Sequence, residues 1–232
     1  MKALPQDIAI LLFLRSEAEE ALAKPLAGGG PRINKAIYKK LNQHAQRQAR
    51  LSGLPLVVVR GSQQSGATFG ERLANAFEHA FAQGYSRIIA IGNDCLALNA
   101  DRLREAAARL EYAGAVLGPA RDGGVYLLGL SRRAYNRSLF LGLPWQTGQL
   151  STALCQYAVQ LNHIPLLMKE EEDADDVFSF RRLAGRLSSR SPLCRYLENL
   201  LHSAFQPHCS LPALLLNEQH HAYLKRGPPA RF

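Results

Sequence analysis

Short apolar runs alternate with helical periodicity along most of the chain, and this alternation limits the possible folds more than any other feature. The runs predict strands at Ile8–Leu14, Leu56–Val59, Arg87–Ile91, Ala115–Leu117, Val125–Leu130 and Ile164–Met168. Helices are predicted at Asn34–Leu51, Phe69–Gln83, Ala100–Tyr112 and Leu150–Leu161, with a short helix or ordered loop at Glu17–Lys24. Strands joined through helices by short loops predict a single α/β, Rossmann-like domain. Its sheet is expected to be mostly parallel, with helices on both faces.

The chain changes character near its C-terminal end. Ser188 to Pro192 is a polar, linker-like break, and Leu193–Phe205 has the apolar spacing of an amphipathic helix. We therefore predict a domain over residues 1–187 and a C-terminal extension over 188–232. The extension is expected to cover the domain's own helices or a second copy of the chain, as in a homodimer. Its histidines do not have the spacing of a structural zinc site.

Charge is distributed unevenly along the chain. The formal net charge is +9; residues 1–60 carry 10 basic and 4 acidic side chains, whereas residues 61–180 carry 10 and 13. A basic rim around an acidic centre suits a phosphate-bearing small molecule held through a metal ion. A solvated basic surface is the alternative interpretation. Nucleic acid is not expected as a partner, because no binding motif accompanies the charge.

The cysteines and the apolar segments bear on the compartment. The 4 cysteines are widely scattered and form no Cys-x-x-Cys pair, which favours a reducing, cytoplasmic location. Ile8 to Leu14 is too short for a signal sequence and runs into an acidic patch. No stretch approaches the roughly 20 apolar residues of a membrane span, so none is predicted.

Carboxylates follow several predicted strands where each strand ends. Asp94 comes just after Arg87–Ile91, and Asp122 lies in the Gly-rich turn before Val125. Asp173 and Asp175 belong to an acidic run after the last strand, and such a run is more often solvated surface. Ligands of open α/β sheets bind beyond the carboxyl ends of the strands. Asp94 paired with Asp173 or Asp175 would therefore suit magnesium or manganese, which prefer oxygen ligands and share them with substrate phosphates.

Four motifs together resemble a known family. They are Ser65–Leu73, Ile91–Cys95, Gly118–Gly129 and Leu143–Thr147. The resemblance is to a bacterial glycosyltransferase-like family with the nucleotide-diphospho-sugar transferase (GT-A) fold. That family is related to guanylyltransferases of the molybdopterin and deazaflavin cofactor pathways. The resemblance covers about residues 8–183, and it implies a transferase acting on a nucleotide-diphosphate sugar.

The resemblance also implies roles for individual residues. Asp94 and Asp122 match carboxylates expected to be catalytic, and Asp94, Asp173 and Asp175 match the expected ligands of a divalent metal, magnesium or manganese. Substrate-binding roles are implied for the residues Arg15, Lys24, Glu71, Arg72, Gly123, Gly124, Trp145 and Thr147. Each has a purely structural interpretation as well. Trp145 would also fit a core, Glu71 with Arg72 a helix cap and its salt-bridge partner, and Gly123 with Gly124 a tight turn.

The chain departs from the family pattern after the first strand. Where the family places glycine and cations for nucleotide phosphates, this chain has Glu19 and Glu20, with only Lys24 and Arg15 as cations. This departure disfavours binding of a triphosphate. We therefore expect a metal-dependent glycosyltransferase-like enzyme. A nucleotidyltransferase that makes a nucleotide-diphosphate product, and a non-catalytic binding or assembly protein on the same fold, are the alternatives.

Overall fold

Six strands form one mixed sheet in the order β2-β1-β3-β5-β4-β6. The computed structural model describes residues 7–28, 30–187 and 192–205. The strands are β1 (Ile8–Phe13), β2 (Leu56–Val59), β3 (Arg87–Ile91), β4 (Ala115–Pro119), β5 (Val125–Ser131) and β6 (Pro165–Leu167). Only β5 runs antiparallel to its neighbours, so the carboxyl ends of the other five strands lie at one edge of the sheet. The predicted mostly parallel α/β sheet is confirmed.

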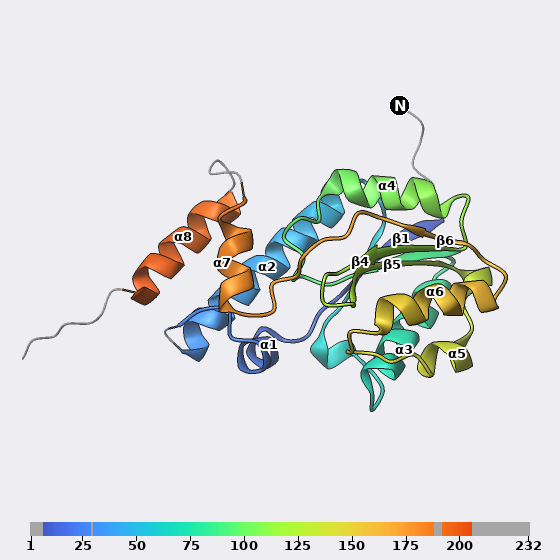
Figure 1. The fold of residues 1–232 in the computed structure, drawn as a ribbon, viewed down its shortest axis with the longest axis horizontal. Helices are drawn as coiled ribbons and strands as arrows, with labels where there is room; N and C mark the ends of the chain where they lie inside the picture. Colours follow the sequence, from blue (N-terminus) through green and yellow to red (C-terminus); the bar gives the residue numbers. More distant parts are fainter. Residues whose placement is uncertain (1–6, 29, 188–191, 206–232) are drawn as a thin grey trace, which may run out of the picture.

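Helices cover both faces of this sheet (Figure 1). They are α1 (Glu17–Ala23), α2 (Pro31–Leu51), α3 (Phe69–Ala82), α4 (Ala100–Leu110), α5 (Arg137–Leu141), α6 (Leu150–Gln160), α7 (Val177–Ala184) and α8 (Pro192–Phe205). Two short 3-10 helices are η1 (Gly61–Gln63) and η2 (Arg132–Ala134). The pleat of β1 sends Ile8, Ile10 and Leu12 toward α2 and α4. Ala9 and Leu11 face the layer of α3, α5 and α6.

Most elements lie within a few residues of the predicted bounds, but α5 and α7 are additional to the prediction. Both are short helices that begin at a side-chain cap. Asn136 accepts a hydrogen bond from the Leu139 N–H at α5. Asp176, which ends the acidic run, accepts from the Phe178 and Ser179 N–H groups at α7. In both helices the cap determines where the helix begins, because neither segment has the long apolar periodicity of the other helices.

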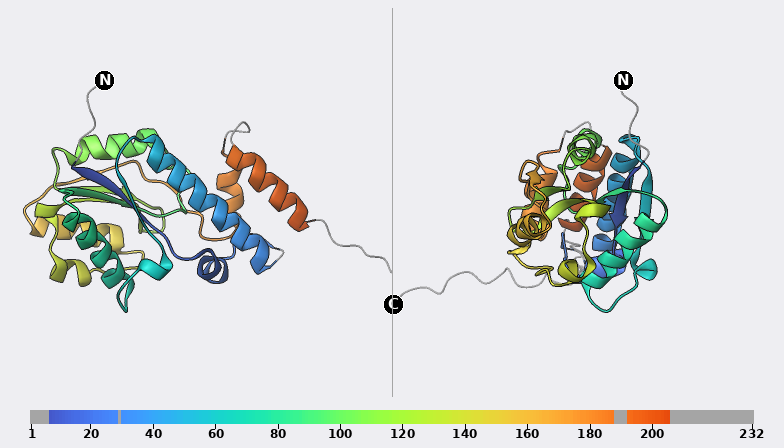
Figure 2. Two further views of the ribbon diagram at one scale, coloured as in Figure 1. Left: turned by 180° about the vertical axis from the view of Figure 1, so that it is seen from behind. Right: turned by 90° about the vertical axis from the view of Figure 1, so that its right-hand side faces the viewer.

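A third apolar cluster lies beyond the carboxyl edge of the sheet, where α1, α7 and α8 pack against the first half of α2 (Figure 2). Tyr38 of α2, Phe180 of α7 and Leu197 of α8 are all buried there. Thus α8 packs on the domain's own helices, on the same surface as α7. The proposed boundary between residues 187 and 188, and the predictions for residues 206–232, lie outside the described residues. Among the described helices, none combines the length and apolar character needed to cross a bilayer.

Candidate active site

A cavity of about 560 Å³ opens at the carboxyl ends of the parallel strands. Asp94 follows β3, and Asp122 lies in the turn between β4 and β5, at the same edge. The acidic segment after β6 also reaches this edge, because the Arg121 N–H donates to the Glu171 carbonyl at 3.0 Å. Nine of the predicted site residues line the cavity, namely Arg15, Lys24, Asp94, Asp122, Gly124, Trp145, Thr147, Asp173 and Asp175.

The chain around Asp94 turns tightly and is anchored on both sides. A Cβ at Gly92 would lie 3.0 Å from the Asp94 carboxylate, so a side chain there would crowd it. The buried Asn93 amide donates to Asn42 of α2 at 2.6 Å. The Asp94 carbonyl accepts from the Ala174 N–H at 3.1 Å, between the two predicted aspartates of the acidic run. These bonds join the two loops that carry the predicted metal ligands.

Like charges gather at one end of the cavity, here called the carboxylate end: Glu20, Asp94, Asp122, Asp173 and Asp175, with the cation Lys24. The Lys24 ammonium lies 2.5 Å from Asp175 and 3.8 Å from Asp94. Burial raises the pKa of Asp94, and Lys24 opposes this shift. Burial, together with the charges of Asp94 and Asp175, raises the pKa of Asp173 to about 9. One ammonium therefore does not balance the carboxylates around it.

Asp173 shows this imbalance most directly. Its Oδ1 atom is buried and has no hydrogen-bond partner among the described residues. A buried carboxylate oxygen without a partner is costly, because desolvation is not offset by any donor. Either a proton or a bound cation would remove that cost.

Glu20 belongs to the carboxylate end, although the sequence motifs did not mark it as a site residue. Burial and the neighbouring Asp94 raise its pKa to about 7. The other two glutamates of α1 are used locally, since Glu17 accepts from Asn42 and Glu19 completes a capping box with Ser16. The spacing of Glu20 and Lys24 could have identified it, because residues four apart share one helix face.

The donor set at the carboxylate end fits a divalent ion that is completed by its ligand. Within residues 7–28, 30–187 and 192–205, no group of three metal-binding side chains is placed to hold an ion by itself. Magnesium commonly uses one or two carboxylates and takes its remaining oxygens from phosphates and water. Asp94 with the unpartnered oxygen of Asp173 offers such a pair. Asp175, also predicted as a ligand, is instead bonded to Lys24.

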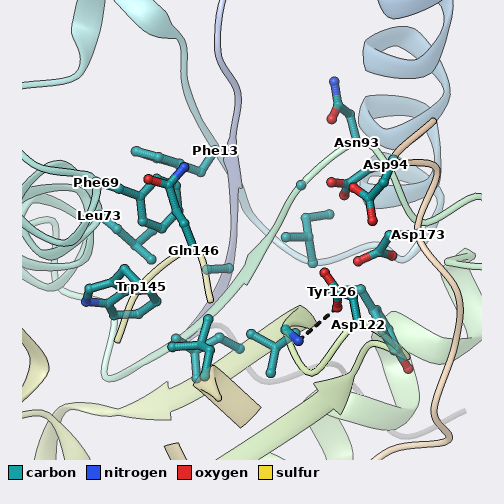
Figure 3. A pocket seen from close by; sticks show the side chains of 18 of the residues that line it. Phe13, Phe69, Leu73, Asn93, Asp94, Asp122, Tyr126, Trp145, Gln146 and Asp173 are labelled. Atoms are coloured by element: carbon teal, nitrogen blue, oxygen red, sulfur yellow. Dashed lines mark hydrogen bonds between the residues drawn. The ribbon is translucent and has the colours of Figure 1, made fainter. Parts of the chain in front are cut away.

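Aromatic and aliphatic side chains form the opposite end of the cavity, here called the aromatic end: Phe13, Phe69, Leu73 and Trp145 (Figure 3). The Phe69 ring lies 5.8 Å from Phe13 and 5.6 Å from Trp145, centroid to centroid. The Trp145 indole N–H donates to the Phe140 carbonyl at 2.9 Å. Only Trp145 among these four was predicted as a site residue. Phe13 ends a buried strand, and Phe69 and Leu73 belong to the Ser65–Leu73 motif but had no role assigned to them.

The two ends are joined by a contact between backbones. Gly123 has φ +86°, and a Cβ there would lie 1.9 Å from the Gly148 carbonyl oxygen. The Ser151 N–H donates to the Gly123 carbonyl at 2.9 Å. Gly123 thus packs the Asp122 turn against the loop that carries Trp145, and it does not itself line the cavity. The neighbouring Gly124 N–H donates to Asp122 at 2.8 Å, the dashed line in Figure 3.

Glu71 and Arg72 lie outside this cavity. The Glu71 carboxylate accepts from the Ala67 and Thr68 N–H groups and completes the capping box of α3. Arg72 donates to the Ala67 carbonyl and lines a separate hollow of about 460 Å³ beside β2. The structure therefore does not bring these two with the other predicted site residues. Thr147 does line the cavity, but its hydroxyl donates to the Pro144 carbonyl at 2.8 Å.

Residues 33–147 match the family DUF2064. Its description is "Uncharacterized protein conserved in bacteria". The match spans β2 to β5 and includes Asp94, Asp122 and Trp145. Among curated proteins, none matches the sequence.

Solved structures share the fold. A "putative nucleotide-diphospho-sugar transferase" from Desulfovibrio desulfuricans G20 is 20% identical, with a TM-score of 0.72 over 86% of this chain and 99% of that chain. At this identity the likeness establishes a nucleotide-diphospho-sugar transferase-like fold and nothing finer. Rv0371c from Mycobacterium tuberculosis H37Rv, in complex with manganese, is 15% identical over 78% of this chain and 99% of that chain. The TM-score for this pair is 0.40.

Proposed function

We propose that this protein is a metal-dependent transferase that moves a sugar from a nucleotide-diphosphate sugar to an acceptor hydroxyl. The observation that carries the proposal is the buried, unpartnered oxygen of Asp173 beside Asp94, at the carboxyl edge of the sheet. Such a pair suits a cation that a diphosphate completes. The shared fold supports the same conclusion at a coarser level.

The charged residues of the cavity would have two roles, metal binding and phosphate binding. Asp94 and Asp173 would hold magnesium or manganese, which when bound supplies positive charge against the diphosphate. Lys24 and Arg15 line the cavity and would place further positive charge beside the phosphates. When the ligand binds, Lys24 would either leave Asp175 or contact both that carboxylate and a phosphate of the ligand.

Asp122 would act as the base. The Gly124 N–H donates to one of its oxygens, and the side chain lines the cavity at the carboxylate end. In the step, the acceptor oxygen bonds to the anomeric carbon while the bond from that carbon to the diphosphate breaks. The bonding electrons leave with the diphosphate, and the acceptor proton passes to Asp122.

A thermal-shift panel tests the proposal, with UDP-glucose, GDP-mannose, UDP and GDP measured with and without manganese. A ligand that binds only the folded state raises its stability by RT ln(1 + [L]/Kd). We expect manganese-dependent stabilisation by a nucleotide sugar, and its loss in Asp173→Asn. Asp101→Asn is the matched control, because the Asp101 side chain is 87% exposed on α4, away from the cavity.

Two results would overturn the proposal. Micromolar binding of GTP, CTP or ATP with magnesium, without binding of nucleotide sugars, would indicate a nucleotidyltransferase. If no nucleotide or nucleotide sugar stabilises the protein at any metal concentration, the cavity is not a donor site, and the fold serves binding or assembly instead.

A further inference from the structure

The aromatic end of the cavity is a preformed apolar surface that the donor chemistry above does not use. Phe13 ends β1, Phe69 begins α3, and Trp145 lies in the loop before α6, so three separate segments contribute to it. Figure 3 shows these rings on one side of the cavity and the aspartates on the other. All three rings are only partly buried, which leaves apolar surface facing the cavity.

Polar groups at this end are already largely satisfied. The Trp145 N–H is bonded to the Phe140 carbonyl. The Thr147 hydroxyl donates to the Pro144 carbonyl and accepts from the Gln149 N–H. The Gln146 side chain also lines the cavity, and its backbone has φ +62°, a conformation that non-glycine residues seldom adopt. At this end, the Gln146 amide is therefore the side-chain group that would hydrogen-bond a ligand.

We propose that the aromatic end binds the apolar group of the acceptor, so that the acceptor is an alcohol bearing an aromatic or aliphatic group rather than a simple polyol. That the bound molecule is the acceptor rests on the proposed function, whereas its apolar character rests on the lining of the cavity alone. Burying apolar surface on preformed apolar walls is favourable in proportion to its area. A polyol placed there would lose hydrogen bonds to water and regain few of them.

The geometry of the rings argues against a nucleobase at this end. The planes of Phe13 and Phe69 meet at 90°, and those of Phe69 and Trp145 at 50°. The walls are thus rounded and do not form a parallel-sided slot for a flat base. Recognition of a base edge also uses two or more hydrogen-bonding groups, whereas one side-chain amide is on offer here.

Trp145 allows a direct test, because the sequence contains 1 tryptophan. Methyl, phenyl and octyl β-glucosides share one sugar and differ only in the group attached to it. They are titrated into the full chain, without metal or donor, while tryptophan emission is recorded. We expect the phenyl and octyl glucosides to change the emission and to bind about tenfold or more tightly than the methyl glucoside, as burial of several carbons predicts.

Three variants locate the binding. Phe69→Ala should reduce the advantage of phenyl over methyl glucoside by about tenfold, since it removes one wall. Phe178→Ala removes an aromatic ring that is 77% exposed on α7 and does not line the cavity, so the advantage should stay. Phe69→Leu keeps an apolar wall and should keep most of the advantage. It also shows whether a loss in Phe69→Ala reflects folding.

The outcomes separate this inference from the proposed function. Equal binding of methyl and phenyl glucosides, or an unchanged emission, would overturn the inference even if nucleotide sugars bind. Uridine or guanosine competing with phenyl glucoside at Trp145 would also overturn it, because the end would then be a base site. Binding of phenyl glucoside without any donor binding would leave the apolar site in place and remove the proposed function.

Discussion

The two ends of the cavity differ in how their interactions are satisfied in the free protein. At the carboxylate end, Asp173 has a buried oxygen without a partner among the described residues, and its pKa is raised to about 9. At the aromatic end, Trp145 has its N–H bonded and its ring 4.7 Å from Phe140. The carboxylate end needs a proton or a cation to satisfy its charges, whereas most polar groups of the aromatic end already have partners. The comparison indicates that the carboxylate end lacks a compensating positive charge, whereas the aromatic end has apolar walls that a ligand of fitting shape could cover.

Replacing Asp94 should give the largest difference in ligand binding between the two ends. Asp94→Asn should abolish manganese-dependent stabilisation by a nucleotide sugar, a loss of about 2.7 kcal/mol when the ligand is present at about 100 times Kd. The ligand-free variant should be at least as stable as the parent, because a charge repelling Asp173 and Asp175 is removed. Thermal unfolding with and without ligand measures both. Binding of phenyl glucoside should be unchanged, and a ligand-free variant several degrees less stable would show that Asp94 is mainly structural.

Gly123→Ala should damage both ends together. Alanine at this position would have to keep φ +86°, and its Cβ would overlap the Gly148 carbonyl. The Asp122 turn and the loop that carries Trp145 must therefore separate. We expect a loss of about 2 kcal/mol or more in the free energy of unfolding, measured by urea denaturation, together with weaker binding of both probes. Gly28→Ala is the control, since a Cβ there meets nothing within 4 Å. Loss of only one kind of binding would mean that the ends are not joined through Gly123.

The aspartates of the carboxylate end were predictable from sequence, whereas the meeting of Phe13 and Phe69 with Trp145 at the aromatic end was not, for a physical reason. A carboxylate directly after a buried strand must lie at the carboxyl edge of the sheet, so the strand pattern alone is enough to place Asp94 and Asp122. Phe13 looks like an ordinary core residue in sequence, and Phe69 lies in the Ser65–Leu73 motif without a role assigned to it. That they meet depends on how α3 packs against β1, which no local pattern encodes.

Some predicted site residues have a structural role, and the sequence shows that role for only part of them. Glu71 forms a capping box, the structural alternative that its spacing from Thr68 allows. Gly123 has the pattern of a turn glycine, but its close contact with Gly148 depends on a loop some 25 residues further along the chain. Sequence predicts the elements of the fold because periodicity is local. It does not predict which backbones will touch.

Gly70→Ala should alter the aromatic end alone. A Cβ at Gly70 would lie 2.6 Å from the Trp145 ring, so the indole must move. Alanine is the better helix former by about 1 kcal/mol, which offsets part of the lost packing, and the net change in stability should be small. We expect a shifted tryptophan emission and about tenfold weaker binding of phenyl glucoside, by the area argument. Manganese-dependent stabilisation by a nucleotide sugar should persist, and its loss would show that the two ends do not act separately.

A further expected effect is a dependence of stability on pH that arises at Glu20. Burial and Asp94 raise the pKa of Glu20 from 4.5 to about 7, so between these values the folded state holds a proton that the unfolded state has lost. The stability of the ligand-free protein therefore falls as pH rises from about 4.5 to about 7. Glu20→Gln removes this contribution. The variant should match the parent near pH 4.5 and be more stable above pH 7, with a Tm that is higher by up to about 10 °C for a domain of this size.

Glu19 provides the opposite case one residue away. Hydrogen bonds from Ser16 lower the pKa of Glu19, so its contribution is present above its unfolded pKa of 4.5 and is lost as the pH falls. Glu19→Gln should leave the decline between pH 4.5 and 7 in place, because glutamine can keep the capping box and Glu20 is untouched. Thermal unfolding of the two variants across this range measures both slopes. If Glu20→Gln keeps the parent's slope while Glu19→Gln loses it, the carboxylate end does not include Glu20, and the charge imbalance lies with the aspartates alone.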